Sequence, residues 1–338
     1  MSVGIDIGSK SIKLVELGWE NGKPFLKGAA VVGVKDLSIE RMQEESEFAT
    51  LAATIKKLVS DAKISSKEIS IALPESQVFT RSIRLPLLTD AEIASAVKWQ
   101  AEEIIPIPTK EAIFQYVVTE RRENAQPPEV LVLVVGAPRT LVEKYVKVMS
   151  LAGLTVTEVE TELIAVTRAL APVNQTSVVV NFGARSTDIA IAKNANLVFG
   201  RTIPTAGDAF TRAITQALGI TPAQAEEYKK TYGLSQTQLE GKVSQALTPI
   251  FKIVVEEIKK AIHFYQTDEK GENPNLIILS GGTAGLPDIS PTLAKMLGTE
   301  VVIANPFSKI SVDPATTQSL KSFAPLYSVA IGLALKEG

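Results

Sequence analysis

Two short segments with the same residue pattern, far apart in the chain, constrain the fold more than any other feature. The first, VGIDIGSKSIKLVE at residues 3–16, is an apolar strand that runs into a glycine turn and is followed by an alternating strand. The second, VVVNFGARSTDIAIA at residues 178–192, repeats this plan at one constant offset. Such an internal repeat predicts two related lobes. The paired positions are Asp6 and Asn181, Gly8 and Gly183, Lys10 and Arg185, Ser11 and Ser186, and Lys13 and Asp188.

Each segment has the residues of a phosphate-binding hairpin. Gly8 lets backbone N–H groups approach an anion, and Asp6 places a carboxylate at the end of the strand. Three further donors follow, from Ser9, Lys10 and Ser11. An ordinary structural hairpin carries the same Asp-x-Gly pattern, so one copy alone favours a structural turn. The second copy favours two lobes that close on one nucleotide.

The composition is that of an ordinary globular protein of about two domains. The chain has 338 residues, of which 45% are hydrophobic, enough for two cores. Its formal net charge is only −2, so no overall field attracts nucleic acid or an anionic membrane. Because the chain has no cysteine and only one histidine, His263, we expect no disulfide, no transition-metal site and no histidine triad. These features fit a reducing compartment and predict a cytoplasmic protein.

The chain carries no pattern of an export signal or a membrane span. No segment reaches 18 consecutive apolar residues, and the first strand begins almost at Met1. The final segment, LYSVAIGLALKEG at residues 326–338, predicts a closing core helix rather than a basic amphipathic tail. We therefore expect contact with a membrane only through a partner.

The region between the two hairpins predicts a lobe with an insert. A strand at residues 25–35, a helix at 46–62 and a strand at 69–74 complete a mixed α/β lobe. From about residue 76 to 154 the pattern changes to strand, helix, two strands and a second helix. Within this insert, Trp99 either fills a seam between subdomains, which is the commoner role, or anchors a peptide.

Further candidate residues lie where strands meet helices. A strand and a helix lead from the insert to the second hairpin, and Glu160, Thr161 or Glu162 at their junction can lie beside a terminal phosphate. Downstream, Gly207 and Asp208 start a helix whose N-terminal N–H groups favour an anion. An aspartate cap is an equal alternative at that position.

Two later segments add candidates of weaker pattern. Glu226 and Lys229 lie one turn apart on a predicted helix, where such a pair usually forms a salt bridge on the solvent side. A buried strand then runs into Gly281, Gly282 and Thr283. There a flat base or a phosphate can lie directly against the backbone.

Together these motifs resemble the actin, Hsp70 and sugar-kinase ATPase superfamily over the whole chain. The resemblance rests on DIGSKS at residues 6–11, NFGARSTD at residues 181–188 and LSGGTAG at residues 279–285. The position of the insert and AEEYKKTYG at residues 225–233 are similar to the division protein FtsA. The W-x-x-E and I-P-x-P segments at residues 99–108 are similar to the PilM family of type IV pilus assembly proteins.

The resemblance implies an α/β fold of the actin-like ATPase type, with two RNase H-like lobes and a 1C insert as in FtsA and PilM. Lobe 1 (1A) would comprise residues 1–172 and about 320–338, with insert 1C at about 76–154. Lobe 2 (2A) would span residues 173–319, with subdomain 2B at about 205–270.

The resemblance also implies ATP and Mg²⁺ held between the lobes, whose hinge closure is the mechanical output. Asp6 and Glu162 would be the catalytic candidates, and Asp6 and Asp188 would hold the metal through water. The glycine turn would contact adenosine, and the helical Glu-Lys pair would flank the ribose and base. The implied cofactor-binding residues are Gly8, Ser9, Lys10, Ser11, Asn181, Gly183, Ala184, Arg185, Ser186, Gly207, Asp208, Glu226, Lys229, Gly281, Gly282, Thr283 and Ala284.

One residue departs from the pattern of the superfamily. Asn181 stands where members usually place an aspartate that orients the water shell of the metal or the attacking water. Its neutral amide forms hydrogen bonds but cannot accept a proton as a general base. We therefore expect nucleotide binding with slow or negligible hydrolysis.

For the PilM family, the resemblance implies a cytoplasmic protein that is peripheral at the inner membrane and acts in pilus assembly and twitching motility. It would bind the N-terminal tail of the inner-membrane protein PilN in a groove between the first lobe and the insert. Other pilus motor or platform proteins and a second copy of the chain are further expected partners.

Two alternative functions stay open. An FtsA-like division scaffold would carry a C-terminal amphipathic membrane helix, and a small-metabolite kinase would need a catalytic carboxylate that faces an acceptor hydroxyl.

Overall fold

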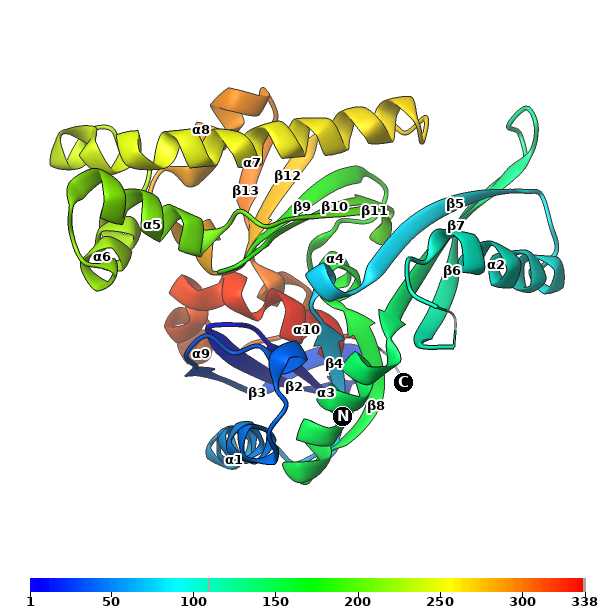
Figure 1. Ribbon diagram of the computed structural model, residues 1–338, viewed down its shortest axis with the longest axis horizontal. Coiled ribbons are helices and arrows are strands. Elements are labelled where there is room, and N and C mark those ends of the chain that lie inside the picture. Colours follow the sequence, from blue (N-terminus) through cyan, green and yellow to red (C-terminus); the bar gives the residue numbers. More distant parts are fainter. Residues whose placement is uncertain (109, 337–338) are drawn as a thin grey trace.

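The fold is built on three β-sheets, two of which share one strand plan (Figure 1). The computed structural model describes residues 1–108 and 110–336. The first sheet contains β1 (Ser2–Ile7), β2 (Ser11–Glu20), β3 (Lys23–Gly33), β4 (Glu68–Leu73) and β8 (Thr155–Thr161). The second sheet contains β9 (Thr176–Phe182), β10 (Thr187–Lys193), β11 (Asn196–Ile203), β12 (Leu276–Ser280) and β13 (Glu300–Ile303).

The internal repeat of the sequence is also a repeat of topology. The strand orders are β3-β2-β1-β4-β8 and β11-β10-β9-β12-β13, so each sheet joins an antiparallel three-stranded meander to two parallel strands. The two hairpins, β1 with β2 and β9 with β10, occupy equivalent places. Strand β9 is buried along its whole length, as expected for a central strand covered on both faces. The predicted mixed α/β fold with two related lobes is therefore confirmed.

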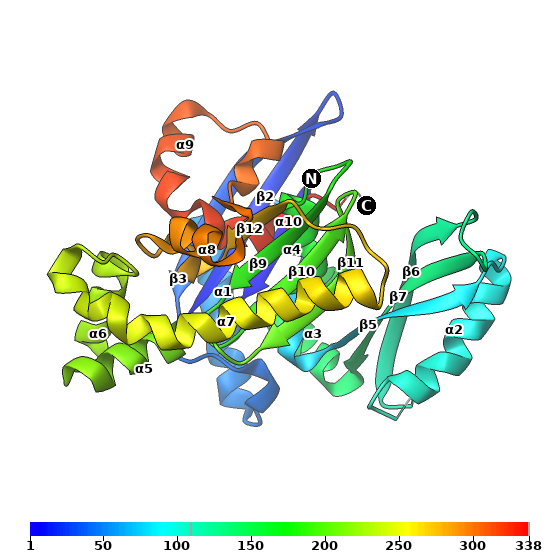
Figure 2. The same cartoon turned by 90° about the horizontal axis from the view of Figure 1, so that it is seen from above.

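Helices cover the faces of both large sheets (Figure 2). Helices α1 and α3 pack on one face of the first sheet, and α10 packs on the other. Helices α5, α7 and α8 cover one face of the second sheet, and α4 covers the other. The helices outside the insert are α1 (Glu45–Asp61), α3 (Arg139–Leu151), α4 (Glu162–Leu170), α5 (Gly207–Leu218), α6 (Pro222–Tyr232), α7 (Lys242–Thr267), α8 (Ile289–Leu297), α9 (Pro314–Leu320) and α10 (Ser328–Ala334).

Helices α4 and α10 lie in direct backbone contact between the two sheets. A Cβ atom built on Gly332 of α10 would lie 1.8 Å from the carbonyl oxygen of Ala165 in α4, so only glycine permits this approach. Every residue of α10 is buried. The closing core helix predicted from the end of the sequence is therefore confirmed, and it completes the first lobe.

The third sheet forms the insert, which projects to the right in Figure 1. Its strands are β5 (Phe79–Pro86), β6 (Ala112–Arg122) and β7 (Glu129–Pro138) in the order β5-β7-β6, with α2 (Asp90–Ile104) packed on one face. Ile93 and Val97 of α2 are fully buried against this sheet, whereas Trp99 is 76% exposed. The interpretation of Trp99 as a seam filler is therefore wrong.

Helix α3 belongs to a different core from the three-stranded sheet. Its buried side chains, among them Leu141 and Tyr145, join the cluster formed by the first sheet and α1. We therefore propose residues 79–138 as the insert, in place of the predicted range 76–154. The other predicted boundaries, at residues 172, 205, 270 and 320, stay predictions.

Within residues 1–108 and 110–336, no helix is both long enough and apolar enough to cross a bilayer.

Candidate functional site

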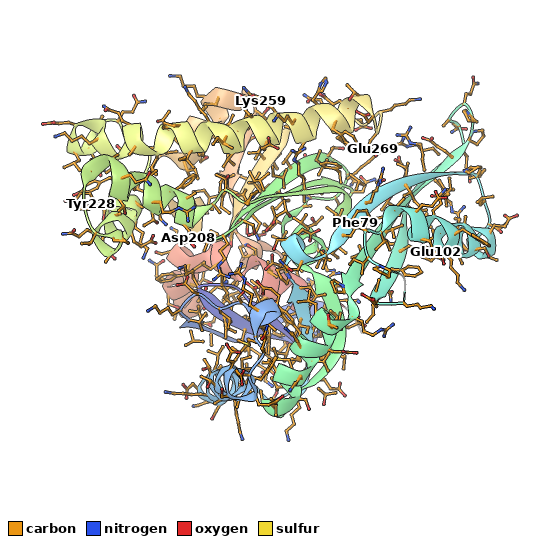
Figure 3. The ribbon with its side chains drawn as sticks, in the orientation of Figure 1. Phe79, Glu102, Asp208, Tyr228, Lys259 and Glu269 are labelled. Carbon is orange, nitrogen blue, oxygen red and sulfur yellow. The ribbon has the colours of Figure 1, made fainter. Side chains whose placement is uncertain are left out.

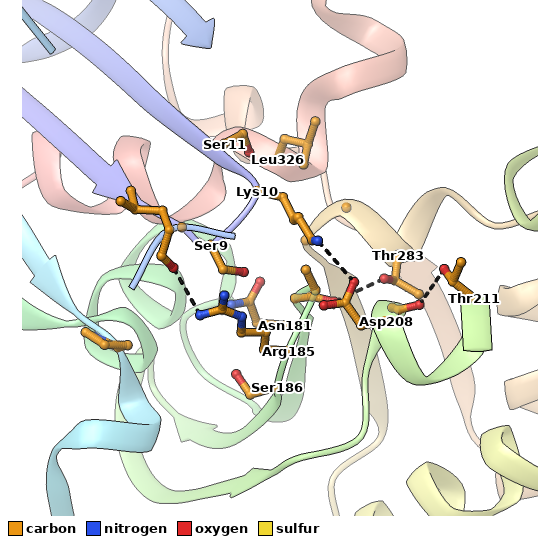
Figure 4. Close-up of a pocket in the computed structure, with 18 of the residues that line it drawn as sticks. Ser9, Lys10, Ser11, Asn181, Arg185, Ser186, Asp208, Thr211, Thr283 and Leu326 are labelled. Carbon is orange, nitrogen blue, oxygen red and sulfur yellow. Dashed lines mark hydrogen bonds and ion pairs between the residues drawn. The ribbon is translucent and has the colours of Figure 1, made fainter. Parts of the chain in front are cut away.

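A cavity of about 1130 Å³ lies between the two large sheets and is lined by both hairpins (Figure 4). Nearly all candidates from the sequence meet there. Ala284 is the exception, because it is buried behind the glycine turn and donates its N–H to the Gly281 carbonyl at 3.2 Å. The candidates that line the cavity are Asp6, Gly8, Ser9, Lys10, Ser11, Glu162, Asn181, Gly183, Ala184, Arg185, Ser186, Asp188, Gly207, Asp208, Glu226, Lys229, Gly281, Gly282 and Thr283.

The two hairpin turns have the same closed geometry. Gly8 donates its N–H to the Ser11 carbonyl at 3.1 Å, and Gly183 donates to the Ser186 carbonyl at 2.9 Å. A Cβ on Gly183 would lie 2.8 Å from that same Ser186 oxygen. Gly183 is therefore required by the tightness of its turn, whereas a Cβ on Gly8 would lie 3.1 Å from the Ser11 oxygen, a tight contact that a small shift can relieve.

The charges behind the two turns differ. In the first hairpin, Asp6 and Lys13 are cross-strand neighbours, and their side chains form a buried ion pair of 3.0 Å. In the second, the equivalent neighbours are Asn181 and Asp188, which provide no cation. Lys13 was aligned with Asp188 in the repeat but was not among the predicted site residues. Its position on the strand that follows the turn, across from Asp6, is the feature of the sequence that could have identified it.

Asp188 is a buried carboxyl with an elevated pKa. Burial raises its pKa to about 7, and the nearby carboxylate of Glu75 adds to the rise, while hydrogen bonds from Thr202 and other neighbours oppose it. The Thr202 hydroxyl donates to Asp188 Oδ1 at 2.8 Å. Asp188 is therefore partly protonated near neutral pH in the free protein, and a cation placed beside it would favour the ionised form.

Among the three connector candidates, Glu162 is the one that lines the cavity. Glu160 instead pairs with Arg168 at 2.7 Å, and Thr161 caps α4 by accepting a hydrogen bond from the Ile164 N–H at 3.3 Å. Burial, followed by repulsion from Asp188 and other acids, raises the pKa of Glu162 well above its ordinary value. Glu162, the first residue of α4, thus places a carboxyl with a raised pKa at the cavity that both hairpins line.

The N-terminus of α5 is occupied by the second hairpin. The N–H groups of Gly207 and Asp208 donate to the carbonyls of Gly183 and Ala184 at 3.2 and 2.8 Å. The structure shows no capping hydrogen bond from the side chain at the N-cap, which is Ala206. Neither sequence interpretation of this turn, free anion donors or an aspartate cap, describes what it does. These two hydrogen bonds attach the N-terminus of α5 to the turn of the second hairpin.

The Glu-Lys pair of α6 is not on the solvent side. Lys229 is buried, and its ammonium donates to Glu226 at 2.6 Å, to the Thr211 hydroxyl at 2.9 Å and to the Gly207 carbonyl at 3.1 Å. The usual solvent-side interpretation is therefore wrong. The pair forms a polar wall of the cavity where α5 and α6 meet.

The glycine turn, residues 281–283, also lines the cavity, next to this wall. Gly281 has a φ of +82°, and a Cβ there would lie 2.3 Å from the Phe182 carbonyl oxygen, so both conformation and space require glycine. Leu326 packs on Gly282, with 3.2 Å between its Cδ2 and the position of an added Cβ. Phe323, 55% exposed, also lines the cavity. The sequence analysis did not identify these apolar residues, since no motif surrounds them.

Two cations reach across the mouth of the cavity. Lys10 forms an ion pair with Asp36 at 2.6 Å and approaches Asp208 of the other lobe at 3.7 Å (Figure 4). Arg185 donates to the Leu37 carbonyl of the first lobe at 3.0 Å. The side chains that would meet phosphate oxygens thus join the lobes directly.

Comparison with known proteins gives one family and one fold. A family model described as type IV pilus assembly protein PilM matches residues 4–338. The cell division protein FtsA of Streptococcus pneumoniae serotype 2 (strain D39) is 24% identical over 367 residues, which cover 95% of this chain and 79% of FtsA. FtsA of Enterococcus hirae is 21% identical over 349 residues, covering 90% and 78%.

Solved structures agree with this match. A PilM-PilN type IV pilus biogenesis complex is similar with a TM-score of 0.83 and 26% identity, covering 99% of this chain and 97% of that one. The protein EutJ of Carboxydothermus hydrogenoformans has a TM-score of 0.61 at 17% identity, covering 99% and 89%. MreB5 of Spiroplasma citri bound to AMPPNP has a TM-score of 0.54 at 13% identity, covering 98% and 93%. The last two likenesses concern the fold alone.

Proposed function

Because the chain belongs to the PilM family of type IV pilus assembly proteins and has the actin-like ATPase fold, we propose that it binds ATP with Mg²⁺ between its lobes. We propose further that the bound nucleotide sets the conformation in which it holds the cytoplasmic tail of a PilN-like membrane protein. The observation that carries the proposal is the pair of glycine hairpins that face one cavity from equivalent strands.

The walls of the cavity fit the parts of a nucleotide. The hairpin turns, with the cations Lys10 and Arg185, suit the phosphates. The backbone of Gly281 and Gly282, beside apolar side chains, suits a flat base. The Glu-Lys wall of α6 suits the ribose hydroxyls. The superfamily members with this fold include an MreB5 bound to AMPPNP, which supports the assignment.

The carboxyls of the site suit a hydrated magnesium ion. Asp6 and Asp188 supply oxygen atoms, which Mg²⁺ prefers, and Mg²⁺ usually keeps several of its waters. Among the residues that the structure describes, no three acidic or histidine side chains are close enough to hold a metal directly. We therefore assign these carboxylates to the water shell of the ion, which would neutralise phosphate charge when bound.

Hydrolysis is expected to be slow or negligible. The amide of Asn181 stands where superfamily members usually place an aspartate, and it cannot take a proton from an attacking water. Glu162 is the group best placed to orient a water, since it alone of the connector candidates lines the cavity. Turnover of MgATP at many molecules per second would contradict this part of the proposal.

The first experiment tests nucleotide binding. MgATP is titrated by calorimetry into the wild-type protein and into Asp6→Ala, with Asp61→Ala, an exposed carboxylate at the end of α1, as the matched control. We expect the Asp6 variant to lose about tenfold or more in affinity and the control to bind as wild type. Full affinity in Asp6→Ala would reject the site.

The second experiment tests the partner. Synthetic N-terminal tails of the membrane proteins of the pilus machinery are titrated into protein loaded with MgATP, and we expect the PilN-like tail to bind. The relative in the PilM-PilN complex supports this choice. We propose the same peripheral, cytoplasmic location at the inner membrane, with other pilus motor or platform proteins and a second copy of this chain as further partners. Binding to no tail would favour an FtsA-like scaffold or a metabolite kinase.

A further inference from the structure

We infer that the insert, although it lies within the first lobe in sequence, is mechanically a part of lobe 2. A cluster of charged residues, here called the charged clamp, holds it there. The clamp consists of Arg84, Glu120, Arg122 and Glu129 of the insert and Lys193 and Glu269 of lobe 2. Closure of the cavity would then shift the insert against lobe 1. This last step rests on the proposed function.

The charged clamp crosses the boundary between insert and lobe 2 at several points. Lys193, at the end of β10, pairs with Glu120 of β6 at 2.7 Å. Arg84 of β5 pairs with Glu269, which follows α7, at 3.1 Å. Arg122 of β6 donates to the Glu269 carbonyl at 3.2 Å. Figure 3 shows Glu269 where the end of α7 approaches the insert.

Within the insert, the same side chains are tied to one another. Arg122 pairs with Glu120 at 2.8 Å and with Glu129 at 3.0 Å. The side chains of Arg122, Glu129 and Glu269 are only 15 to 17% exposed. Pairs with so little solvent exposure are screened less by salt than surface pairs, and a network holds its members more firmly than isolated pairs do. The clamp is therefore a fixed connection.

Apolar side chains also connect the insert to lobe 2, in addition to the charged clamp. Leu133 of β7 is buried in one cluster with Leu163 of α4 and Val179 of β9. Strand β11 lies against all three strands of the insert. A Cβ on Gly200 of β11 would lie 3.8 Å from the Thr80 methyl group, so the Thr80 side chain of β5 packs against β11. The same cluster also contains Ala72 of β4 and Leu333 of α10, so the insert packs on lobe 2 at a place where lobe 2 also meets lobe 1.

The connection to lobe 1 is of a different kind. The chain enters the insert after Leu73 of β4 and leaves it at Arg139, the first residue of α3. Helix α3 itself packs in the separate core of lobe 1. Ala137, near the end of β7, is buried in that core as well. In the part of the chain that the structure describes, no ion pair joins the insert to lobe 1, whereas Arg84–Glu269 and Lys193–Glu120 join it to lobe 2, and such a charge network resists rotation. A hinge between the lobes therefore carries the insert with lobe 2.

The absence of cysteine allows spin labels to be placed cleanly for a test of this inference. Exposed positions exist on each body: Val117 on the insert, Leu151 on lobe 1 and Ile253 on lobe 2. Three full-length proteins carry cysteines at two of these positions each, and double electron–electron resonance measures each distance with and without Mg-AMPPNP. We expect the distance between 117 and 253 to stay constant, while those from 151 to 117 and from 151 to 253 change together.

Two outcomes are distinguishable. If the distance between 117 and 253 changes while that between 117 and 151 stays fixed, the insert moves with lobe 1 and the inference is wrong. If the distance between 151 and 253 does not respond to nucleotide, nucleotide-driven closure in the proposed function fails instead. Variants measured without nucleotide then test whether the charged clamp holds the insert on lobe 2.

In those variants, the width of the distance distribution between 117 and 253 reports how firmly the insert is held. Lys193→Glu opposes Glu120 across the boundary, and we expect the distribution to broaden about twofold. Lys193→Arg keeps a cation beside Glu120 and should keep the wild-type width, and the circular dichroism of Lys193→Glu should match that of wild type, which loss of folding would not allow. The control is Lys259→Glu, the same charge change on an exposed part of α7. A wild-type width in Lys193→Glu would overturn the inference.

Discussion

At the scale of single residues, the two hairpins differ in charge though they share one backbone plan. Asp6 has a cationic neighbour in Lys13, so its charge is compensated inside the protein. Asp188 occupies the position of Lys13, and its cross-strand neighbours are the amide of Asn181 and the hydroxyl of Thr202, neither of which is a cation. A buried carboxyl without a cation is costly to ionise. The second hairpin is therefore only partly charged near neutral pH, and a bound cation would increase its negative charge.

This difference predicts how stability depends on pH. The pKa of Asp188 lies near 7 in the folded protein, above the ordinary value of 3.8, so folding favours the protonated form. Its contribution to stability is complete below pH 3.8 and is lost as the pH rises toward 7. Asp188→Asn has no such loss. We expect its free energy of unfolding, relative to wild type, to rise between pH 4 and 7 by on the order of 2 kcal/mol.

The measurement is urea unfolding in EDTA across this pH range, followed by circular dichroism. Asp61→Asn, at an exposed carboxyl on α1, serves as the control and should follow wild type at every pH. If the curves of Asp188→Asn and wild type ran parallel, Asp188 would be ionised throughout, and the charge difference between the hairpins would have no energetic consequence.

At the scale of elements, the sequence predicted what depends on local pattern. Helix α1 and strands β3 and β4 were found within two residues of where their apolar patterns placed them. The partner of a buried face was not predictable in the same way. Leu141 and Tyr145 mark a face of α3 that must be buried, but their spacing is the same whether α3 covers the insert or lobe 1. Only the tertiary packing shows that α3 belongs to the core of lobe 1 and not to the core of the three-stranded sheet.

The close contact of α4 and α10 shows a second limit of sequence analysis. Gly332 lies within a run of small and apolar residues, and nothing local shows that an added methyl group would meet the Ala165 carbonyl at 1.8 Å. We predict that Gly332→Ala separates the two helices and lowers the free energy of unfolding by roughly 1–3 kcal/mol or more. Urea unfolding measures this change.

The matched control is Gly33→Ala. An added Cβ at Gly33 has no neighbour within 4 Å, and the position is exposed at the end of β3. Its effect should stay within about 0.5 kcal/mol of wild type. Equal effects of the two substitutions would mean that α4 and α10 can move apart without cost.

At the scale of the whole molecule, the lobes are joined by the groups proposed to bind phosphate. Lys10 bonds with Asp36 and approaches Asp208, while Arg185 reaches the Leu37 carbonyl and lies 4.0 Å from Asp36. The hydrogen bond from Lys10 lowers the pKa of Asp36, so this carboxylate is ionised at neutral pH. In the proposed function, Asp36 would therefore compete with the phosphates of the nucleotide for these two cations. The sequence could not show this competition, because Asp36 lies outside both motifs.

Removal of that competitor gives a test of the arrangement. In Asp36→Asn, Lys10 and Arg185 lose their anionic partner, so we expect the Kd for MgATP to fall by about two- to fivefold. The nucleotide-free protein should also become more open, with a larger radius of gyration in small-angle scattering, while the nucleotide-bound form stays unchanged. Asp61→Asn should alter neither quantity. A weaker affinity in Asp36→Asn would show that Asp36 assists phosphate binding, and an unchanged radius would show that these contacts do not hold the lobes together.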